Sequence, residues 1–171
     1  MRQVTSLQTA LSPPGMVARV KISPAVEMDG LPEGNKLALR VYLVEDSDVM
    51  RQQLMMTLSE ELSIDWVGFA ETETEAREWF ERNPAGWDIA LVDLYLREGT
   101  GAGVLRHCRK RPEAQDVLVM TNHPTSSLLT HCRLLGANAV FDKSKELGDL
   151  IAYCIGRAYH SSAPKTQVFF Q

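Results

Sequence analysis

Short apolar segments alternate with amphipathic segments five times along this chain, and this alternation limits the fold more than any other feature. The apolar segments end at polar residues, as expected for strands that are buried on both faces. The five predicted strands cover residues 39–44, 66–70, 88–93, 117–121 and 139–143. The amphipathic segments repeat apolar residues at helical spacing. The five predicted helices cover residues 48–62, 72–83, 102–111, 126–135 and 145–158.

Strict alternation of strands and helices predicts parallel strands, because a parallel neighbour needs a crossover connection and a helix normally supplies it. The five strands would form one doubly wound sheet. We therefore expect an α/β fold with a five-stranded parallel sheet and helices on both of its faces.

The segments outside this pattern are not expected to add a second domain. Residues 1–36 carry prolines and glycines and show no sustained apolar period. They are predicted to be a disordered N-terminal extension, with a partner-binding arm as the alternative. Residues 37–160 make up the predicted domain, and residues 161–171 a short C-terminal tail with no output domain.

Charge and hydropathy exclude several classes of function. The net charge of −4 offers no clustered basic patch, so no nucleic-acid partner is expected. No apolar run is long enough to span a bilayer, and residues 2–19 lack the compact apolar core of a signal peptide. These features predict a cytoplasmic protein without a membrane partner. Cys108, Cys132 and Cys154 fall on the apolar phase of predicted helices, which indicates buried thiols rather than a disulfide or metal site.

Polar side chains follow four of the predicted strands, and these residues form the candidate site. Glu45 and Asp46 follow the first strand, Asp93 ends the third, Thr121 ends the fourth, and Lys143 ends the fifth. Ligands of open α/β sheets bind beyond the carboxyl ends of the strands, so these side chains are expected to converge. Each of them alone could be a turn, cap or surface residue.

Together these residue types predict a site that accepts a phosphoryl group. The carboxylates of Glu45, Asp46 and Asp93 would repel one another, and a hard divalent ion such as Mg²⁺ would allow all three to stay ionised. Lys143 adds a positive charge and Thr121 a hydroxyl that can hydrogen-bond an oxyanion. A carboxylate nucleophile in such a setting suits phosphoryl transfer, which depends on positioning and charge neutralisation.

Several short motifs make residues 39–159 resemble the receiver domain of two-component response regulators. The motifs are Leu43-Val44-Glu45-Asp46, Leu91-Val92-Asp93-Leu94, Val119-Met120-Thr121, Gly136-Ala137 and Phe141-Asp142-Lys143. The resemblance implies a flavodoxin-like sheet with strand order 2-1-3-4-5, an order that is described for a chemotaxis receiver.

The resemblance also implies a role for each site residue. Asp93 would be the phosphoacceptor, Thr121 would bind phosphoryl oxygens, and Lys143 would pair with the phosphoryl group. The implied Mg²⁺ ligands are Glu45, Asp46, Asp93 and the backbone carbonyl of Tyr95. Such a protein is a signalling phosphoacceptor and not an enzyme in the usual sense, since it catalyses at most its own phosphotransfer and autodephosphorylation.

The implied partners are a sensor histidine kinase or phosphotransfer protein upstream and a protein target downstream. The target would bind the face formed by the fourth helix, fifth strand and fifth helix, and the same face could support a homodimer. The expected function is that of a single-domain response regulator that signals through protein contacts.

A departure from the family pattern at Val140, together with the long N-terminal extension, leaves an alternative open. Val140 stands where the family often has an aromatic residue, and Phe141 should point to the opposite face of the strand. The alternative is therefore a pseudo-receiver, a binding module that works without phosphorylation. A phosphatase of the haloacid dehalogenase type is disfavoured, because Tyr95 occupies the position of its second aspartate.

Overall fold

A computed structural model of the protein describes residues 38–162. The strands are β1 (Leu39–Val44), β2 (Ile64–Ala70), β3 (Ile89–Asp93), β4 (Asp116–Thr121) and β5 (Ala139–Asp142). The helices are α1 (Asp48–Glu61), α2 (Glu73–Arg82), α3 (Gly101–His107), α4 (Ser126–Leu134) and α5 (Leu147–Ser162), with a short 3₁₀ helix, η1 (Cys108–Lys110), after α3.

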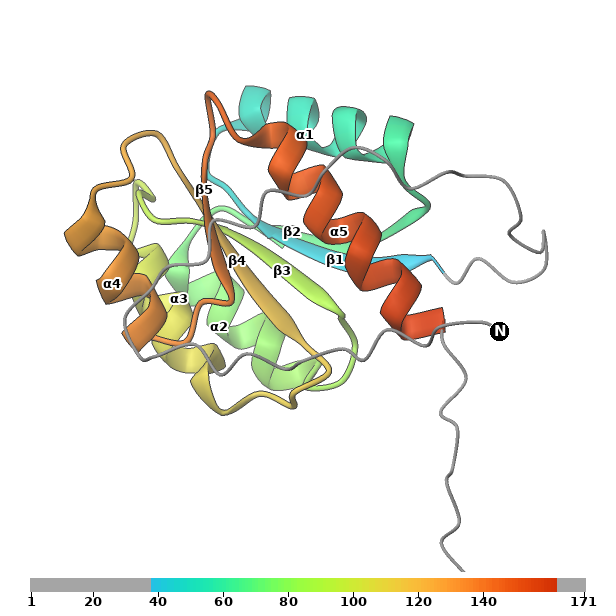
Figure 1. The fold of residues 1–171 in the computed structure, drawn as a ribbon. Coiled ribbons are helices and arrows are strands. Elements are labelled where there is room, and N and C mark those ends of the chain that lie inside the picture. Colours follow the sequence, from blue (N-terminus) through green and yellow to red (C-terminus); the bar gives the residue numbers. More distant parts are fainter. Residues whose placement is uncertain (1–37, 163–171) are drawn as a thin grey trace, which may run out of the picture. The chain divides into compact units, whose positions relative to one another are not determined.

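The five strands form one parallel sheet in the order β2-β1-β3-β4-β5, which confirms the predicted fold and strand order. Helices α1 and α5 lie on one face of this sheet, and α2, α3 and α4 cover the other (Figure 1). Among residues 38–162, no helix has the length and apolar character needed to cross a membrane.

The sheet separates two apolar cores. Alternate residues of β3 point to opposite faces, so Ala90 and Val92 pack towards α2, α3 and α4, whereas Ile89 and Leu91 pack towards α1 and α5. All five residues of β3 are buried, which explains its continuous apolar sequence. The strands β1, β3 and β4 lie in the centre of the sheet and are almost wholly buried, so their carboxyl ends have well-defined positions.

Several element boundaries differ from the sequence prediction. Strand β2 begins at Ile64, two residues earlier than predicted, because it pairs with the whole of β1. Helix α3 ends at His107 and tightens into η1 ahead of Pro112. Helix α5 continues to Ser162, so it includes residues 161 and 162 of the predicted tail. The predicted N-terminal extension, residues 1–36, lies outside the described residues.

Helix α4 is less buried than the helical spacing of its leucines had indicated. Only Cys132 of its predicted inward residues is buried, whereas Leu128, Leu129 and Leu135 are half-buried. The reason is its position beside β5, at the edge of the sheet, where fewer side chains surround it. Cys108, Cys132 and Cys154 are free and buried, as predicted.

A bulge in β2 makes room for an aromatic stack. Tyr42 pairs with Gly68 one register step beyond the Val41–Trp66 pair, so β2 carries one extra residue there. Tyr42 stacks on Trp79 of α2 with ring centroids 3.9 Å apart. A Cβ at Gly68 would approach the Tyr42 ring to 3.1 Å, and the φ of Gly68, +154°, is rarely adopted by other residues.

We predict that Gly68→Ala destabilises the domain by roughly 1–3 kcal/mol, because the stacked rings and the strained backbone must both adjust. The matched control is Gly156→Ala in α5, where an added Cβ meets nothing within 4 Å. That change is expected to stabilise by roughly 0.5–1 kcal/mol, as alanine favours helix over glycine. Urea unfolding of both variants measures the difference, and shifts of the same sign would contradict this explanation.

Candidate functional site

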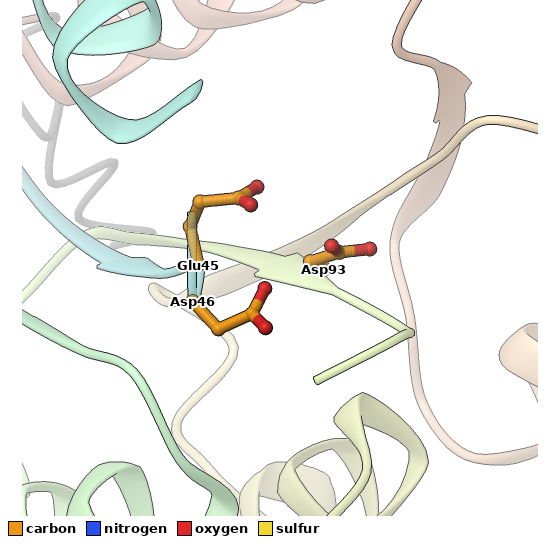
Figure 2. A group of neighbouring side chains, drawn as sticks. All are labelled: Glu45, Asp46 and Asp93. Carbon is orange, nitrogen blue, oxygen red and sulfur yellow. The ribbon is translucent and has the colours of Figure 1, made fainter. Parts of the chain in front are cut away.

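The carboxyl ends of the parallel strands bring the predicted site residues to one edge of the sheet. Glu45 and Asp46 follow β1, and Asp93 is the last residue of β3. Their carboxylates point into the same space beyond the strands (Figure 2). One oxygen from each lies within 4.8 Å of the others. The sequence prediction that these three acids converge is confirmed.

Lys143 crosses this edge and joins two of the acids. Its Nζ lies 2.6 Å from Glu45 Oε2 and 2.7 Å from Asp93 Oδ2. The Lys143 side chain is only 5% exposed, and both carboxylates are buried with it. Its backbone N–H also donates to the carbonyl of Thr121, so the end of β4 fixes the lysine in place.

Burial and ion pairing have opposite effects on the pKa values of Lys143 and Glu45. Burial by itself lowers the pKa of Lys143, but the hydrogen bonds that its ammonium donates to Asp93 and Glu45 outweigh this effect and raise the pKa above its ordinary value. Burial raises the pKa of Glu45, and the nearby Asp93 raises it further, although Lys143 opposes both effects. The lysine is therefore held in its charged form between acids that crowd one another.

The remaining predicted residues are Thr121, the last residue of β4, and Tyr95, two residues after Asp93. Thr121 is fully buried, and its Oγ1 has no hydrogen-bond partner among the described residues. A buried hydroxyl without a partner is costly, and a phosphoryl oxygen would satisfy it. The backbone N–H of Tyr95 donates to Asp93 Oδ1 at 3.2 Å, and the Tyr95 ring is exposed.

The donor set fits a hard divalent cation. Three carboxylates offer oxygen ligands at one edge, and Mg²⁺ is commonly bound by one or two carboxylates together with phosphate oxygens and water. Glu45, Asp46 and Asp93 are the residues that would hold it. Their assignment as ligands remains a prediction, as do the roles of Thr121, Lys143 and the Tyr95 carbonyl.

Two arginines contact the acidic residues, and the sequence analysis missed both. Arg97, in the loop after β3, donates from its backbone N and its Nε to Asp46 Oδ2, both at 3.0 Å. Arg51 of α1 is buried and donates to the carbonyl of Glu45 at 3.1 Å, and it pairs with Glu71 at the same distance. The spacing of Arg51 on the apolar phase beside Leu54 and Leu58 was a signal for its burial.

The glycine-rich loop after β3 packs closely against neighbouring elements. Glu73, at the start of α2, accepts a hydrogen bond from the backbone N of Thr100 at 2.8 Å. A Cβ at Gly103 would overlap the Glu73 carboxylate, and one at Gly101 would overlap the Asp93 carbonyl. The glycines therefore allow α2 and α3 to approach the end of β3 closely.

Residues Val140 and Phe141 point to opposite faces of β5, as predicted. Val140 packs against the core beneath α2, α3 and α4, whereas Phe141 belongs to the core beneath α1 and α5. Phe141 meets the ring of Tyr153 at 6.1 Å between centroids. An aromatic side chain is thus present on β5, but it faces α5.

We predict that Lys143→Met lowers the free energy of unfolding by up to about 3 kcal/mol, because two buried carboxylates lose their counter-charge. Lys145→Met is the matched control, since Lys145 is 79% exposed and 3.7 Å from Asp142. The control is expected to change stability by less than about 0.5 kcal/mol. Chemical denaturation in a chelator tests both variants, and equal effects would show that Lys143 has no special role in stability.

Comparisons with known proteins identify the family to which this fold belongs. The model of the response regulator receiver domain matches residues 41–154. The structure resembles the receiver domain of the putative response regulator NarL from Mycobacterium tuberculosis, with a TM-score of 0.62, 22% identity, and coverage of 71% of this chain and 97% of that one. It also resembles the phosphorylated cyanobacterial phytochrome regulator RcpA, with a TM-score of 0.59, 22% identity, and coverage of 74% and 97%.

A curated relative is the DNA-binding transcriptional activator DevR/DosR of Mycobacterium tuberculosis, which is 30% identical over 101 residues. The match covers 58% of this chain, and the chain spans 45% of the length of that relative. Because this relative is a DNA-binding protein, the expectation of no nucleic-acid partner is not supported. The match to the family model covers all five strands of the sheet except the first two residues of β1. The chain belongs to the response regulator receiver domain family.

Proposed function

We propose that this protein accepts a phosphoryl group on Asp93, with Mg²⁺, from a histidine kinase or phosphotransfer protein. The observation that carries the proposal is the position of the Asp93 carboxylate at the end of a buried strand. It lies beside two further acids and within hydrogen-bond distance of a buried lysine. This arrangement combines a nucleophile with the charges that phosphoryl transfer requires.

In the proposed step, a carboxylate oxygen of Asp93 attacks the phosphorus of a phosphohistidine. The new P–O bond forms as the P–N bond breaks, and the bonding pair leaves with the imidazole nitrogen. The product is an acyl phosphate on Asp93. Mg²⁺ held by Glu45, Asp46 and Asp93 would supply neutralisation of the negative phosphoryl oxygens.

The residues around Asp93 would receive the phosphoryl group. The Lys143 ammonium would turn from the carboxylate oxygen to a phosphoryl oxygen, since its Nζ already lies 2.7 Å from Asp93 Oδ2. The Thr121 hydroxyl would donate to another phosphoryl oxygen and gain the partner that it lacks among the described residues. The exposed side chain of Tyr95, two residues after Asp93, would limit attack by water on the acyl phosphate.

We propose that the signal leaves through the face formed by α4, β5 and α5. Thr121 and Asp142 are paired in the β4–β5 register, so a movement of Thr121 would reach this face directly. A cytoplasmic location and a protein target remain part of this proposal.

The direct test is labelling with a small phosphodonor. With Mg²⁺ and acetyl phosphate, the wild-type protein is expected to gain one phosphoryl group by intact mass, because the Asp93 carboxylate lies beside the buried lysine and two further acids. Asp93→Asn should gain none, and a chelator should prevent labelling. Asp65→Asn is the control, since it removes an exposed carboxylate from β2. Labelling of Asp93→Asn at the wild-type rate would refute the assignment.

A pseudo-receiver is the second candidate function, and the ion pairs favour it. Lys143 pairs with both Glu45 and Asp93, and Arg97 pairs with Asp46, so each of the three acids already has a cationic partner from the chain itself, although the two cations balance only two of the three charges. Such a site could persist as a structural element in a binding module. Absence of both Mg²⁺ binding and labelling in the wild-type protein would support this function.

A further inference from the structure

Arg97 holds the acidic residue Asp46 through three hydrogen bonds. Its backbone N and Nε both lie 3.0 Å from Asp46 Oδ2, and its Nη2 lies 2.6 Å from the Asp46 carbonyl oxygen. The two residues are 51 positions apart in the chain. Arg97 thereby joins the loop after β3 to the loop after β1, directly beside Asp93.

The positively charged side chains of Lys143 and Arg97 differ in how easily they can move away from their carboxylate partners. Lys143 is 5% exposed and is fixed through its backbone to β4. The Arg97 side chain is 76% exposed, whereas Asp46 is 15% exposed. An exposed ion pair contributes little free energy, because water solvates the released guanidinium well. Arg97 is therefore the cation that can be exchanged, and Lys143 the one that stays.

A guanidinium on Asp46 opposes a divalent cation at the same carboxylate. It occupies the Oδ2 oxygen with a charge-assisted hydrogen bond, and its positive charge repels a metal ion at Oδ1 or at Asp93. Replacing the guanidinium by a neutral group would remove both effects. The hydrogen bond from the backbone N of Arg97 to Asp46 does not depend on the side chain, so the loop would stay in place.

We propose that Arg97 is a positioning residue that competes with the divalent cation for Asp46 and so sets the metal affinity of the site. This inference rests on the proposed function, because it assumes that Asp46 is a metal ligand. Metal binding would release the Arg97 side chain, while the hydrogen bond from the backbone N of Arg97 to Asp46 would keep the loop between β3 and α3 in place.

The test compares Mn²⁺ binding, followed by electron paramagnetic resonance of the free ion, with Mg²⁺ as the competitor. Arg97→Gln is expected to bind Mn²⁺ about two- to fivefold more tightly than wild type, the range for removing one exposed ion pair. The control Arg77→Gln removes the same charge from an exposed position on α2 and should leave the affinity unchanged. Arg97→Lys, which keeps the charge without the planar fork, should fall between wild type and Arg97→Gln.

The salt dependence gives a second readout. The difference between wild type and Arg97→Gln should shrink as ionic strength rises, because salt screens an exposed pair. Equal or weaker Mn²⁺ binding by Arg97→Gln would overturn the inference while leaving the proposed function intact. Failure of wild type and Arg97→Gln alike to bind Mn²⁺ would overturn both, since then Asp46 would not be a metal ligand.

Discussion

The pair of hydrogen bonds from the Lys143 ammonium to Glu45 and Asp93 is the interaction on which the site depends. These hydrogen bonds join the ends of β1, β3 and β5. Lys143 is 98 residues from Glu45 and 50 residues from Asp93 in the chain. Taking these three charges out of water is costly, and the cost is offset only when the geometry is close. The parallel sheet supplies that geometry, because it delivers all three residues to one edge.

The site thus has a buried part and an exchangeable part. Lys143 lies deep between Asp93 and Glu45, whereas Arg97 covers Asp46 from the solvent side. Thr121 adds a buried hydroxyl without a partner among residues 38–162. A phosphoryl group and a divalent cation would meet complementary groups at each of these positions. This complementarity explains why a cluster of crowded acids can be useful despite its cost.

The architecture and the converging residues could be predicted from the sequence, because buried parallel strands have continuous apolar sequences and their polar ends must meet. The arginine contacts could not. Arg97 and Arg51 have long, flexible side chains, and their partners depend on how distant loops approach one another. The bulge at Gly68 and the shallow burial of α4 also depend on neighbours that no local pattern specifies.

The edge of the sheet that carries Asp93 is, in the function proposed above, a switchable phosphoryl site. Nuclear magnetic resonance of the backbone amides, with Mg²⁺ and then with beryllofluoride as a phosphoryl mimic, tests it most directly. The predicted result is a set of shifts at Asp93, Thr121 and Lys143 that extends into α4 and β5 and is absent in Asp93→Asn. Spectra unchanged by beryllofluoride, or changed equally in Asp93→Asn, would contradict the claim.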